Sequence, residues 1–435
     1  MALHTDISLR NKVIYCIFVR NHTGAGTFRA LEADLDRLKA LGTDILWLMP
    51  IYPIGVKNRK GTLGSPYAIC DYRDFNPEYG TREDFLHLVQ EIHRRCMRCI
   101  IDVVYNHTSP DSVLAAEHPE FFLRDEDGKP TRKVADWWDI VDLDYTNRDL
   151  WAYQIETLCR WAEIVDGFRC DVASTVPVEF WLEAREAVER VHPGCIWLAE
   201  SVFAGLTMDL RRRGIVSATD TELYRAFDLT YDYDVWPYFE GYLAGKNTLR
   251  EYINMINFQE EQYPGNYVKL RFLENHDQPR MAQRLTDEDI LRSWLAFTYF
   301  ERGAVLLYSG SEFAARHRVT LFDADDCYRD QTADLQEYLQ ILGRVKKSLP
   351  LSGCFRLRAC EGGIVMGAYD GPGGTARGIF PLEGRGGRIF VDLPDGTYVD
   401  SIASGRTAVR NGYVECGKEP LIFCAAASEQ KTLIG

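Results

Sequence analysis

The chain has 435 residues, of which 46% are hydrophobic, 26% charged and 12% aromatic, and its formal net charge at pH 7 is −14. A chain of this length exceeds the size at which a single hydrophobic core stops growing, so we expect one large domain with one or two smaller ones. The negative charge argues against nucleic acid and against an anionic membrane surface as partners, because both are bound by positive charge.

The N-terminal segment "MALHTDISLRNKVIYCIFVRN" lacks the basic stretch and long apolar stretch of a secretory signal. No run in the sequence approaches the roughly 18 apolar residues of a membrane-spanning helix. The twelve cysteines, several of them inside strand-like runs, are typical of reduced core residues. Cys96 and Cys99 have the spacing of a redox or zinc pair, but no second pair accompanies them. These features predict a cytoplasmic protein without such a metal site.

Short apolar runs alternate with helical patterns over most of the chain. The runs are typical of strands buried on both faces, and they span residues 13–20, 45–51, 99–105, 167–173, 196–201, 225–231, 267–275 and 303–309. Apolar residues at helical spacing lie between most of them, in residues 27–42, 81–95, 147–164, 178–191, 247–260 and 286–300. Eight strands that alternate with helices favour a closed (β/α)8 barrel, the TIM barrel, over an open α/β sheet.

Two stretches depart from this alternation. Residues 108–146, after the third strand, are too long for a plain loop and predict a subdomain inserted over the mouth of the barrel. After about residue 350 the helical pattern ends, and short strand-like runs are separated by Gly and Asp-Gly turns. We therefore predict a barrel domain in residues 1–107 and 147–349, the insert in 108–146, and a C-terminal antiparallel β-sandwich domain in 350–435.

Polar side chains gather where the strands of this barrel are predicted to end, which is where (β/α)8 barrels carry their functional groups. They are Asp102, Asn106 and His107 at the third strand, Arg169 and Asp171 at the fourth, Glu200 at the fifth, Asn275, His276 and Asp277 at the seventh, and Tyr67 in the loop after the second. A single acidic residue at a strand end is more often a helix cap or an ion-pair partner. Three carboxylates on one rim would repel one another, so Asp171, Glu200 and Asp277 together predict a catalytic site.

Four short motifs, in this order along the chain, resemble the α-amylase family, glycoside hydrolase family 13. They are "DVVYNH" (102–107), "GFRCDVA" (167–173), "LAES" (198–201) and "FLENHD" (272–277). The segments "SPYAICDYRDFNPEYGTREDF", "VDLDYTN" and "LLYSGSEF" extend the resemblance over residues 13–345, and "LPDGTYVDSIASG" fits the family's C-terminal β domain. The resemblance implies a retaining hydrolase that acts on α-glucans through a covalent glycosyl-enzyme intermediate.

The resemblance also implies a role for each matched residue. Asp171 would be the nucleophile, Glu200 the acid/base and Asp277 the third carboxylate. His107 and His276 would bind sugar hydroxyls at the cleavage point. Tyr67 would stack on that sugar. Asp102 would be structural, fixing Arg169 or the end of its strand.

The residue types support the same roles independently. Arg169 lies two residues before Asp171, on the same side of the strand, where it can keep the nucleophile ionised. Glu200 follows the apolar residues 197–199, and we expect this setting to raise its pKa towards that of a useful acid. Carboxyl groups of a retaining pair lie roughly 5–5.5 Å apart, which the tips of adjacent strands allow.

Departures from the family bear on substrate and on calcium. Many α-amylases have a Lys-His pair after the nucleophile, where this chain has Ser174 and Thr175. "DVAS" is closer to maltogenic and neopullulanase-like members, and "NHDQPR" to α-glucosidases that act on oligosaccharides. Asn106 and Asp142 match positions that ligate calcium in some members, and oxygen ligands suit that ion. Calcium is therefore the one cofactor that the resemblance suggests, but we expect no functional requirement for it.

Packing among aromatic residues is expected to hold the insert instead of an ion. Phe121, Phe122, Trp137 and Trp138 would form its small core. The two tryptophans are equally compatible with sugar platforms at the edge of the cleft.

The sequence thus predicts a cytoplasmic α-glucan hydrolase that cleaves α-1,4 bonds in maltodextrins. An α-1,6-active glucosidase or a transglycosidase is the alternative, since water and a sugar hydroxyl compete for the same intermediate. A third hypothesis is a non-enzymatic relative such as the amino-acid transporter heavy chains. Those proteins carry a membrane anchor and typically lose catalytic groups, and we expect neither feature here. Chain-length preference, endo or exo action and oligomeric state are left open.

Overall fold

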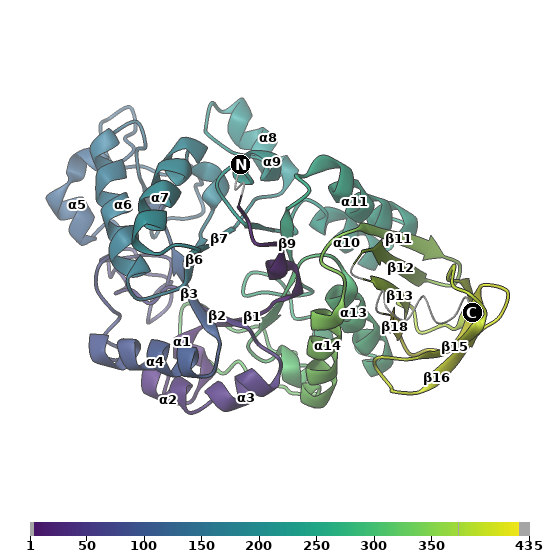
Figure 1. Ribbon diagram of the computed structural model, residues 1–435. Helices are drawn as coiled ribbons and strands as arrows, with labels where there is room; N and C mark the ends of the chain where they lie inside the picture. The colour runs from purple at the N-terminus through teal and green to yellow at the C-terminus, as the bar shows by residue number, and fades with distance from the viewer. Residues whose placement is uncertain (1–3, 373, 426–435) are drawn as a thin grey trace. The chain divides into compact units, whose positions relative to one another are not determined.

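Eight parallel strands form a closed barrel in the computed structural model, which describes residues 4–372 and 374–425. The spatial order is β1-β10-β9-β8-β7-β6-β3-β2. The strands, labelled in part in Figure 1, are β1 (Val13–Ile17), β2 (Ile45–Leu48), β3 (Arg98–Val103), β6 (Gly167–Cys170), β7 (Ile196–Ala199), β8 (Leu229–Tyr231), β9 (Val268–Arg271) and β10 (Ala304–Tyr308). The predicted fold class, a (β/α)8 barrel followed by a C-terminal antiparallel β domain, is confirmed.

The apolar runs of the sequence explain the barrel strands. β2 ("ILWL") and β10 ("AVLLY") are buried at every position, as strands covered on both faces must be. Most strands end earlier than the apolar pattern predicted. As a result, Asp171 and Glu200 are the first residues after β6 and β7 rather than members of them.

The described residues form two compact units, each of which contains part of the barrel. The first comprises residues 4, 14–231 and 318–329, and the second comprises 5–13, 232–317, 330–372 and 374–425. Among these described residues, none of the helices combines the length and the apolar character needed to cross a bilayer.

The helices of the first unit follow the predicted pattern with one difference. They are α1 (Val19–His22), α2 (Phe28–Glu32), α3 (Leu35–Ala40), α4 (Arg82–Arg94), α5 (Val113–Glu117), α6 (Arg148–Ala162), α7 (Val178–Val191), α8 (Ala204–Arg212) and α9 (Asp220–Leu223). Figure 1 shows α6 and α7 side by side, in agreement with their packing contacts. The single helix predicted for residues 27–42 is wrong. It is interrupted at Asp34, whose carboxylate pairs with His22 (2.8 Å) and Arg37 (2.6 Å).

The insert after the third strand contains little regular structure. A short ladder pairs β4 (His107–Thr108) antiparallel with β5 (Val141–Asp142). Phe121 and Phe122 are buried, as predicted for its core. Trp138, however, is 52% exposed, so its predicted place in that core is wrong. Lys60 explains the difference, because its Nζ lies 4.4 Å from the centroid of the Trp138 ring, a cation–π contact that suits a surface position.

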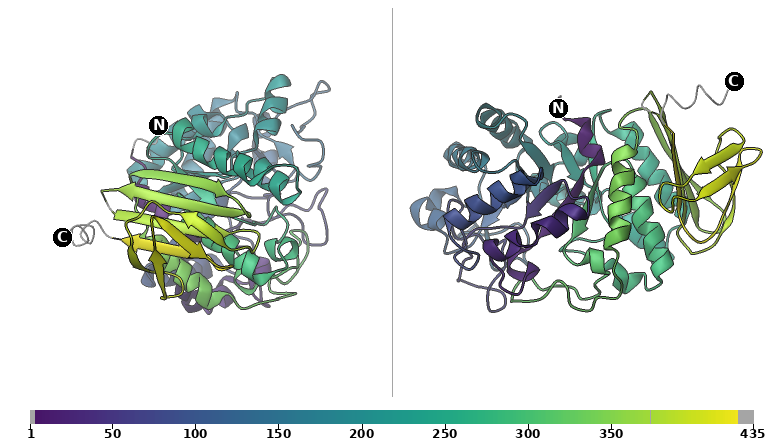
Figure 2. Two further views of the ribbon diagram at one scale, coloured as in Figure 1. Left: turned by 90° about the vertical axis from the view of Figure 1, so that its right-hand side faces the viewer. Right: turned by 60° about the horizontal axis from the view of Figure 1, so that its bottom comes forward.

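The second unit carries the last barrel helices and the C-terminal strands. Its helices are α10 (Trp236–Leu243), α11 (Leu249–Gln262), α12 (Met281–Arg284), α13 (Glu288–Phe300) and α14 (Gln336–Ser348). Four antiparallel strands, green to yellow in Figure 2, form a sheet in the order β11 (Cys354–Cys360), β12 (Ile364–Gly371), β13 (Gly374–Pro381) and β18 (Leu421–Ala425). Two further ladders pair β14 (Gly387–Phe390) with β17 (Tyr413–Cys416), and β15 (Gly396–Val399) with β16 (Arg406–Val409).

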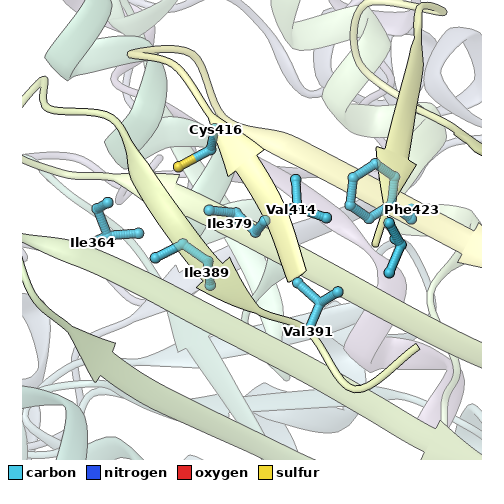
Figure 3. Packing of buried hydrophobic residues seen from close by; sticks show 8 residues of the cluster. Ile364, Ile379, Ile389, Val391, Val414, Cys416 and Phe423 are labelled. Carbon is cyan, nitrogen blue, oxygen red and sulfur yellow. The ribbon is translucent and has the colours of Figure 1, made fainter. Parts of the chain in front are cut away.

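Buried apolar side chains join these C-terminal ladders into one core. Figure 3 shows Ile364, Ile379 and Phe423 of the four-stranded sheet beside Ile389 and Val414 of the β14–β17 ladder. Side chains from more than one sheet therefore share this core, as expected of packed antiparallel layers.

Helix α13 packs against the same sheet through aromatic rings. The Phe300 ring lies 5.2 Å from the Phe380 ring, measured between centroids. Gly367 and Gly378 face each other in the β12–β13 ladder, and a Cβ on Gly367 would lie 2.5 Å from the Phe300 ring. The two glycines therefore leave room for the helix to approach the sheet.

Candidate active site

A single buried arginine links the carboxylates at the ends of β3, β6 and β7. The Arg169 side chain is 0% exposed, and its Nη1 donates hydrogen bonds to Asp102 Oδ1 and Asp171 Oδ1, both at 2.8 Å. Its Nη2 lies 3.0 Å from Glu200 Oε2. One guanidinium thus compensates the negative charge of three carboxylates. Asp171 and Glu200 belong to the three that the sequence predicted to converge on this rim, whereas the third carboxylate on Arg169 is Asp102 and not Asp277.

Strand register places the two central carboxylates side by side. Cys170 of β6 pairs with Ala199 of β7, and Asp171 and Glu200 are the next residue of each strand. The ladder continues into these residues, because Glu200 N donates to Cys170 O at 3.0 Å. Adjacent strands lie about 4.8 Å apart, so the backbones of Asp171 and Glu200 are separated by roughly that distance.

A strained turn follows Asp171 and binds Glu200. Val172 has φ 42°, in the left-handed region that β-branched residues rarely adopt. In this conformation its backbone N–H donates to Glu200 Oε2 at 2.7 Å. We predicted apolar surroundings for the Glu200 carboxyl group, and this prediction is wrong for Oε2. That oxygen accepts from a backbone amide and lies 3.0 Å from Arg169 Nη2. The preceding residues 197–199 are apolar, but the carboxylate extends beyond them into the polar rim.

Burial and charge act against each other around Arg169. Burial disfavours its positive charge, yet Asp102 and Glu200 together raise the pKa of Arg169 above its ordinary value. Burial raises the pKa of Asp102 to about 7, while Arg169 opposes this shift. Asp102 Oδ2 also accepts a hydrogen bond from Tyr67 at 3.1 Å. The contact that we predicted between Asp102 and Arg169 is present.

Aromatic rings surround the guanidinium on several sides. The Arg169 Cζ atom lies 5.1 Å, 5.8 Å and 5.5 Å from the ring centroids of Trp47, Tyr67 and Tyr231. Trp47 and Tyr231 are fully buried, whereas Tyr67 is half-buried. Tyr67 is therefore the ring of these three that remains accessible to a sugar.

His107 lies beside Asp171 and is oriented by its neighbour in the chain. Its Nε2 is 4.0 Å from Asp171 Oδ2, and its Nδ1 is 3.0 Å from Asn106 Nδ2. An Nδ1 that accepts from an amide leaves the ring hydrogen on Nε2. The Trp137 ring lies 5.6 Å from the His107 ring, so the insert reaches the active-site histidine.

The predicted residues after β9 lie in a turn of the second unit. Asn275 Oδ1 accepts from the backbone N–H groups of Asp277 (2.9 Å) and Gln278 (3.1 Å). His276 is buried, and its Nε2 lies 3.2 Å from Asp277 Oδ2. The Asp277 side chain is 43% exposed. The first unit therefore brings together Asp102, His107, Arg169, Asp171, Glu200 and Tyr67, and the second unit brings together His276 and Asp277.

Protein groups bind the oxygens that calcium would need. Lys133 Nζ donates to Asn106 Oδ1 at 2.7 Å and lies 3.8 Å from Asp142 Oδ2. Thr175 Oγ1 lies 2.7 Å from the same Asn106 oxygen, in position to donate to it. Asn106 and Asp142 therefore do not fit the ligand set of calcium, because an ammonium group lies where the cation would bind. Nor do the described ranges contain three or more His, Cys, Asp or Glu side chains grouped to hold a metal ion.

Comparison with known families identifies the chain. The model of the α-amylase catalytic domain matches residues 18–346, and that of the bacterial α-amylase C-terminal domain matches residues 356–423. The chain belongs to the α-amylase family. It is thus a glycoside hydrolase by family, as the four motifs predicted, and the non-enzymatic alternative is set aside.

Solved α-amylase structures resemble the chain over nearly its whole length. An α-amylase from Lactobacillus plantarum is 46% identical with a TM-score of 0.94, and the match covers 97% of this chain and 100% of that one. The maltogenic α-amylase AmyB from Thermotoga neapolitana is 35% identical with a TM-score of 0.85, over 96% of this chain and 99% of that one.

Curated relatives of the α-amylase family include both hydrolases and transferases. The α-1,4-glucan:maltose-1-phosphate maltosyltransferase of Rhodospirillum rubrum is 31% identical over 58% of this chain and 36% of that protein. The α-amylase MalA of Haloarcula japonica is 26% identical over 78% of this chain and 49% of that protein. The matches thus span between about a third and a half of the length of these relatives.

Sequence reasoning missed several residues of the site. Tyr231 ends a barrel strand, and that position was a signal that could have identified it. Val172 and Lys133 carried no such signal, since neither a strained backbone nor a lysine in an irregular loop can be recognised from the residue type.

Proposed function

We propose that this α-amylase family protein is a retaining α-glucan hydrolase that cleaves α-1,4-glucosidic bonds in maltodextrins. The observation that carries the proposal is the placement of Asp171 and Glu200 at equivalent positions of adjacent strands, with Arg169 in contact with both. Retaining pairs lie roughly 5–5.5 Å apart and inverting pairs roughly 6.5–9.5 Å apart. Asp171 and Glu200 reach the same guanidinium from adjacent strands, at 2.8 Å and 3.0 Å, and this proximity supports the retaining mechanism.

In the first step, Asp171 attacks the anomeric carbon of the sugar at the cleavage point. Arg169 Nη1 donates to Oδ1 of Asp171 and so fixes the orientation of the nucleophile. Glu200 donates a proton to the glycosidic oxygen as the bond between that oxygen and the anomeric carbon breaks. Because Val172 N holds Glu200 Oε2, we assign the transferred proton to Oε1.

In the second step, water replaces the departed sugar. Glu200, now ionised, takes a proton from the water, and the water oxygen bonds to the anomeric carbon. The bond between that carbon and Asp171 breaks, which restores both carboxyl groups. Two displacements on one carbon return the original configuration.

We propose substrate-binding roles for the remaining predicted residues. Asp277 would be the third carboxylate, which its partial exposure after β9 supports. His107 and His276 would bind hydroxyls of the sugar at the cleavage point. Tyr67 would stack on the C–H face of that sugar, which the half-buried state of its ring supports.

Transfer to a sugar hydroxyl is the second candidate function. The observation in its favour is the match to a protein named as a maltosyltransferase, since such an enzyme passes its sugar to an acceptor other than water. Cleavage of α-1,6 bonds is a variant of the same chemistry, because the nucleophile and the acid/base are unchanged.

We also propose a cytoplasmic location. All twelve cysteines are free thiols, as is typical of proteins kept in a reducing compartment. Immunodetection in cytoplasmic and exported fractions of the source cells tests this location.

Product analysis on maltoheptaose, pullulan and panose tests the proposed function. We expect shorter maltodextrins from maltoheptaose, and NMR of the first products should show the α-anomer. Products longer than maltoheptaose would indicate transfer, and cleavage of the α-1,6 bond of panose would indicate the other alternative. Initial release of the β-anomer would contradict the retaining mechanism.

A further inference from the structure

We propose that Lys133 is a positioning residue of the active site, whose ammonium group takes the place of a calcium ion between the insert and the barrel and holds Asn106 and, through it, His107. This inference rests on the proposed function only in that His107 binds the substrate. Asn106 and Asp142 match positions that ligate calcium in some members of the family, whereas in this chain they contact Lys133.

The Lys133 ammonium is enclosed by protein oxygens. Its Nζ donates to Asn106 Oδ1 at 2.7 Å and lies 3.8 Å from Asp142 Oδ2. The Lys133 side chain is 12% exposed and that of Asp142 is 0% exposed. An ion pair with this little exposure is not a surface salt bridge, and removal of one charge would leave the other buried and uncompensated.

The backbone of Lys133 is fixed as well. Its N–H donates to Asp142 Oδ2 at 2.9 Å, and its C=O accepts from Arg213 Nη2 at 2.5 Å. The backbone from which the Lys133 side chain extends is therefore held on both sides of its Cα atom.

Asn106 connects Lys133 to the active-site residue His107. Asn106 Oδ1 is bound by Lys133 and lies within hydrogen-bonding distance of Thr175 Oγ1, and its Nδ2 lies 3.0 Å from His107 Nδ1. His107 Nε2 in turn lies 4.0 Å from Asp171 Oδ2. Asn106 Nδ2 also donates to Asp142 Oδ1 at 3.3 Å, so Lys133 contacts both partners of this hydrogen bond. Loss of the ammonium would remove the charged donor to Asn106 Oδ1 and weaken the hold on the amide that orients the His107 ring.

A cation that is part of the chain leaves no need for calcium at this position. Lys133 already supplies the positive charge for the Asp142 carboxylate and the Asn106 oxygen. Thermal melting of the wild-type protein after dialysis against EDTA, with and without added calcium, tests this point without any variant. We expect the same melting temperature and the same maltoheptaose hydrolysis in both. A melting temperature and an activity that both rise with calcium would overturn the proposal.

The variant Lys133→Met removes the charge and keeps most of the side-chain volume. We expect kcat/KM for maltoheptaose to fall by about 10- to 100-fold, the usual loss when a group that orients a ligand is removed. Lys129→Met is the matched control, since Lys129 lies in the same insert and 3.8 Å from Asp127, but 75% exposed. Lys129→Met should keep wild-type activity. Wild-type activity of Lys133→Met would overturn the proposal.

A double-mutant cycle separates positioning of His107 from simple support of the insert. In a His107→Ala background, Lys133→Met should change kcat/KM by about twofold or less, because its effect would already be lost. An equal loss in both backgrounds would show that Lys133 does not act through His107. If Lys133→Met does not fold, Lys133→Gln, which also removes the charge but keeps a polar end, serves as the second variant in the same cycle. Inactivity of the wild-type protein on maltoheptaose would instead contradict the proposed function and leave the calcium test valid.

Discussion

Two cations with little or no exposed side-chain surface lie near the ends of the first unit's barrel strands, and they differ in how they bind their partners. Arg169 contacts Asp102, Asp171 and Glu200 through two nitrogens of one planar fork. Lys133 places a single ammonium on one amide oxygen, with one carboxylate at a longer distance. A fork fixes the directions of several partners at once, whereas a point charge neutralises its surroundings with little directional demand.

The two cations also differ in how firmly each keeps its charge. The carboxylates around Arg169 raise the pKa of its guanidinium despite complete burial. Burial lowers the pKa of Lys133, although Asp142 and Asp144 oppose this shift. The comparison indicates that Arg169 maintains the charge pattern of the reaction centre, while Lys133 supports the wall beside it. Substitutions at the carboxylates and at the two cations test this division.

The largest effect is expected for Asp171→Asn. The amide keeps the volume of the side chain but cannot form the glycosyl-enzyme. We expect kcat for maltoheptaose to fall by about 10⁵-fold or more, the order of loss that follows removal of a covalent nucleophile. Circular dichroism and melting should show an intact fold. Near-normal turnover would contradict the assignment of the nucleophile.

A smaller loss with a distinctive rescue is expected for Glu200→Gln. Removal of the acid/base should lower the rate on maltodextrin by about 10²- to 10⁴-fold. An α-glucosyl fluoride, whose leaving group needs no proton, should still form the intermediate, and azide should release it. The measurement is the rate on both substrates with and without azide. If azide restores nothing and the fluoride reacts as poorly as maltodextrin, Glu200 is not the acid/base.

The variants Arg169→Lys and Lys133→Arg exchange the two cation types and should differ in stability. Arg169→Lys keeps a positive charge but cannot contact three carboxylates, so we expect destabilisation of about 3–5 kcal/mol, as for a broken buried ion pair. Lys133→Arg keeps a charge at a site with weak directional demand and should cost less. Denaturant unfolding of the two variants measures both values. Equal losses would contradict the distinction between fork and point charge.

The smallest effect is expected in the pH dependence of stability at Asp102. The pKa of Asp102 is raised to about 7 in the folded protein, above the ordinary value of about 4 in the unfolded chain. Between these values the folded protein binds a proton that the unfolded chain does not. Acidification through this window should therefore stabilise the wild-type protein relative to Asp102→Asn.

Denaturant unfolding of the wild-type protein and Asp102→Asn, at several pH values between about 5 and 8, measures this difference. Asn has nearly the same shape and does not titrate. The stability advantage of the wild type should be largest at the acidic end and should be lost as the pH rises through about 7. A difference that stays constant between pH 5 and 8 would show that Asp102 remains ionised throughout, and would contradict this prediction.

The barrel and the resemblance to the α-amylase family could both be predicted from the sequence alone. Short apolar runs that alternate with helical patterns are typical of strands covered on both faces, and the four motifs overlap the ends of such runs. The helix at residues 82–94 was equally predictable, since Thr81 and Asp84 form a local capping box. In these cases the interactions that determine the structure lie within a few residues of one another, or follow from hydrophobic pattern alone.

The contacts between side chains at the site could not be predicted from the sequence and are seen only in the folded structure. The sharing of Arg169 by three carboxylates depends on the register of β3, β6 and β7. The backbone contact from Val172 to Glu200 depends on a strained turn, and the position of Lys133 depends on how an irregular loop folds back on Asn106. Contacts between distant segments have no periodicity in the sequence, because they arise when the whole chain packs and not from local preference.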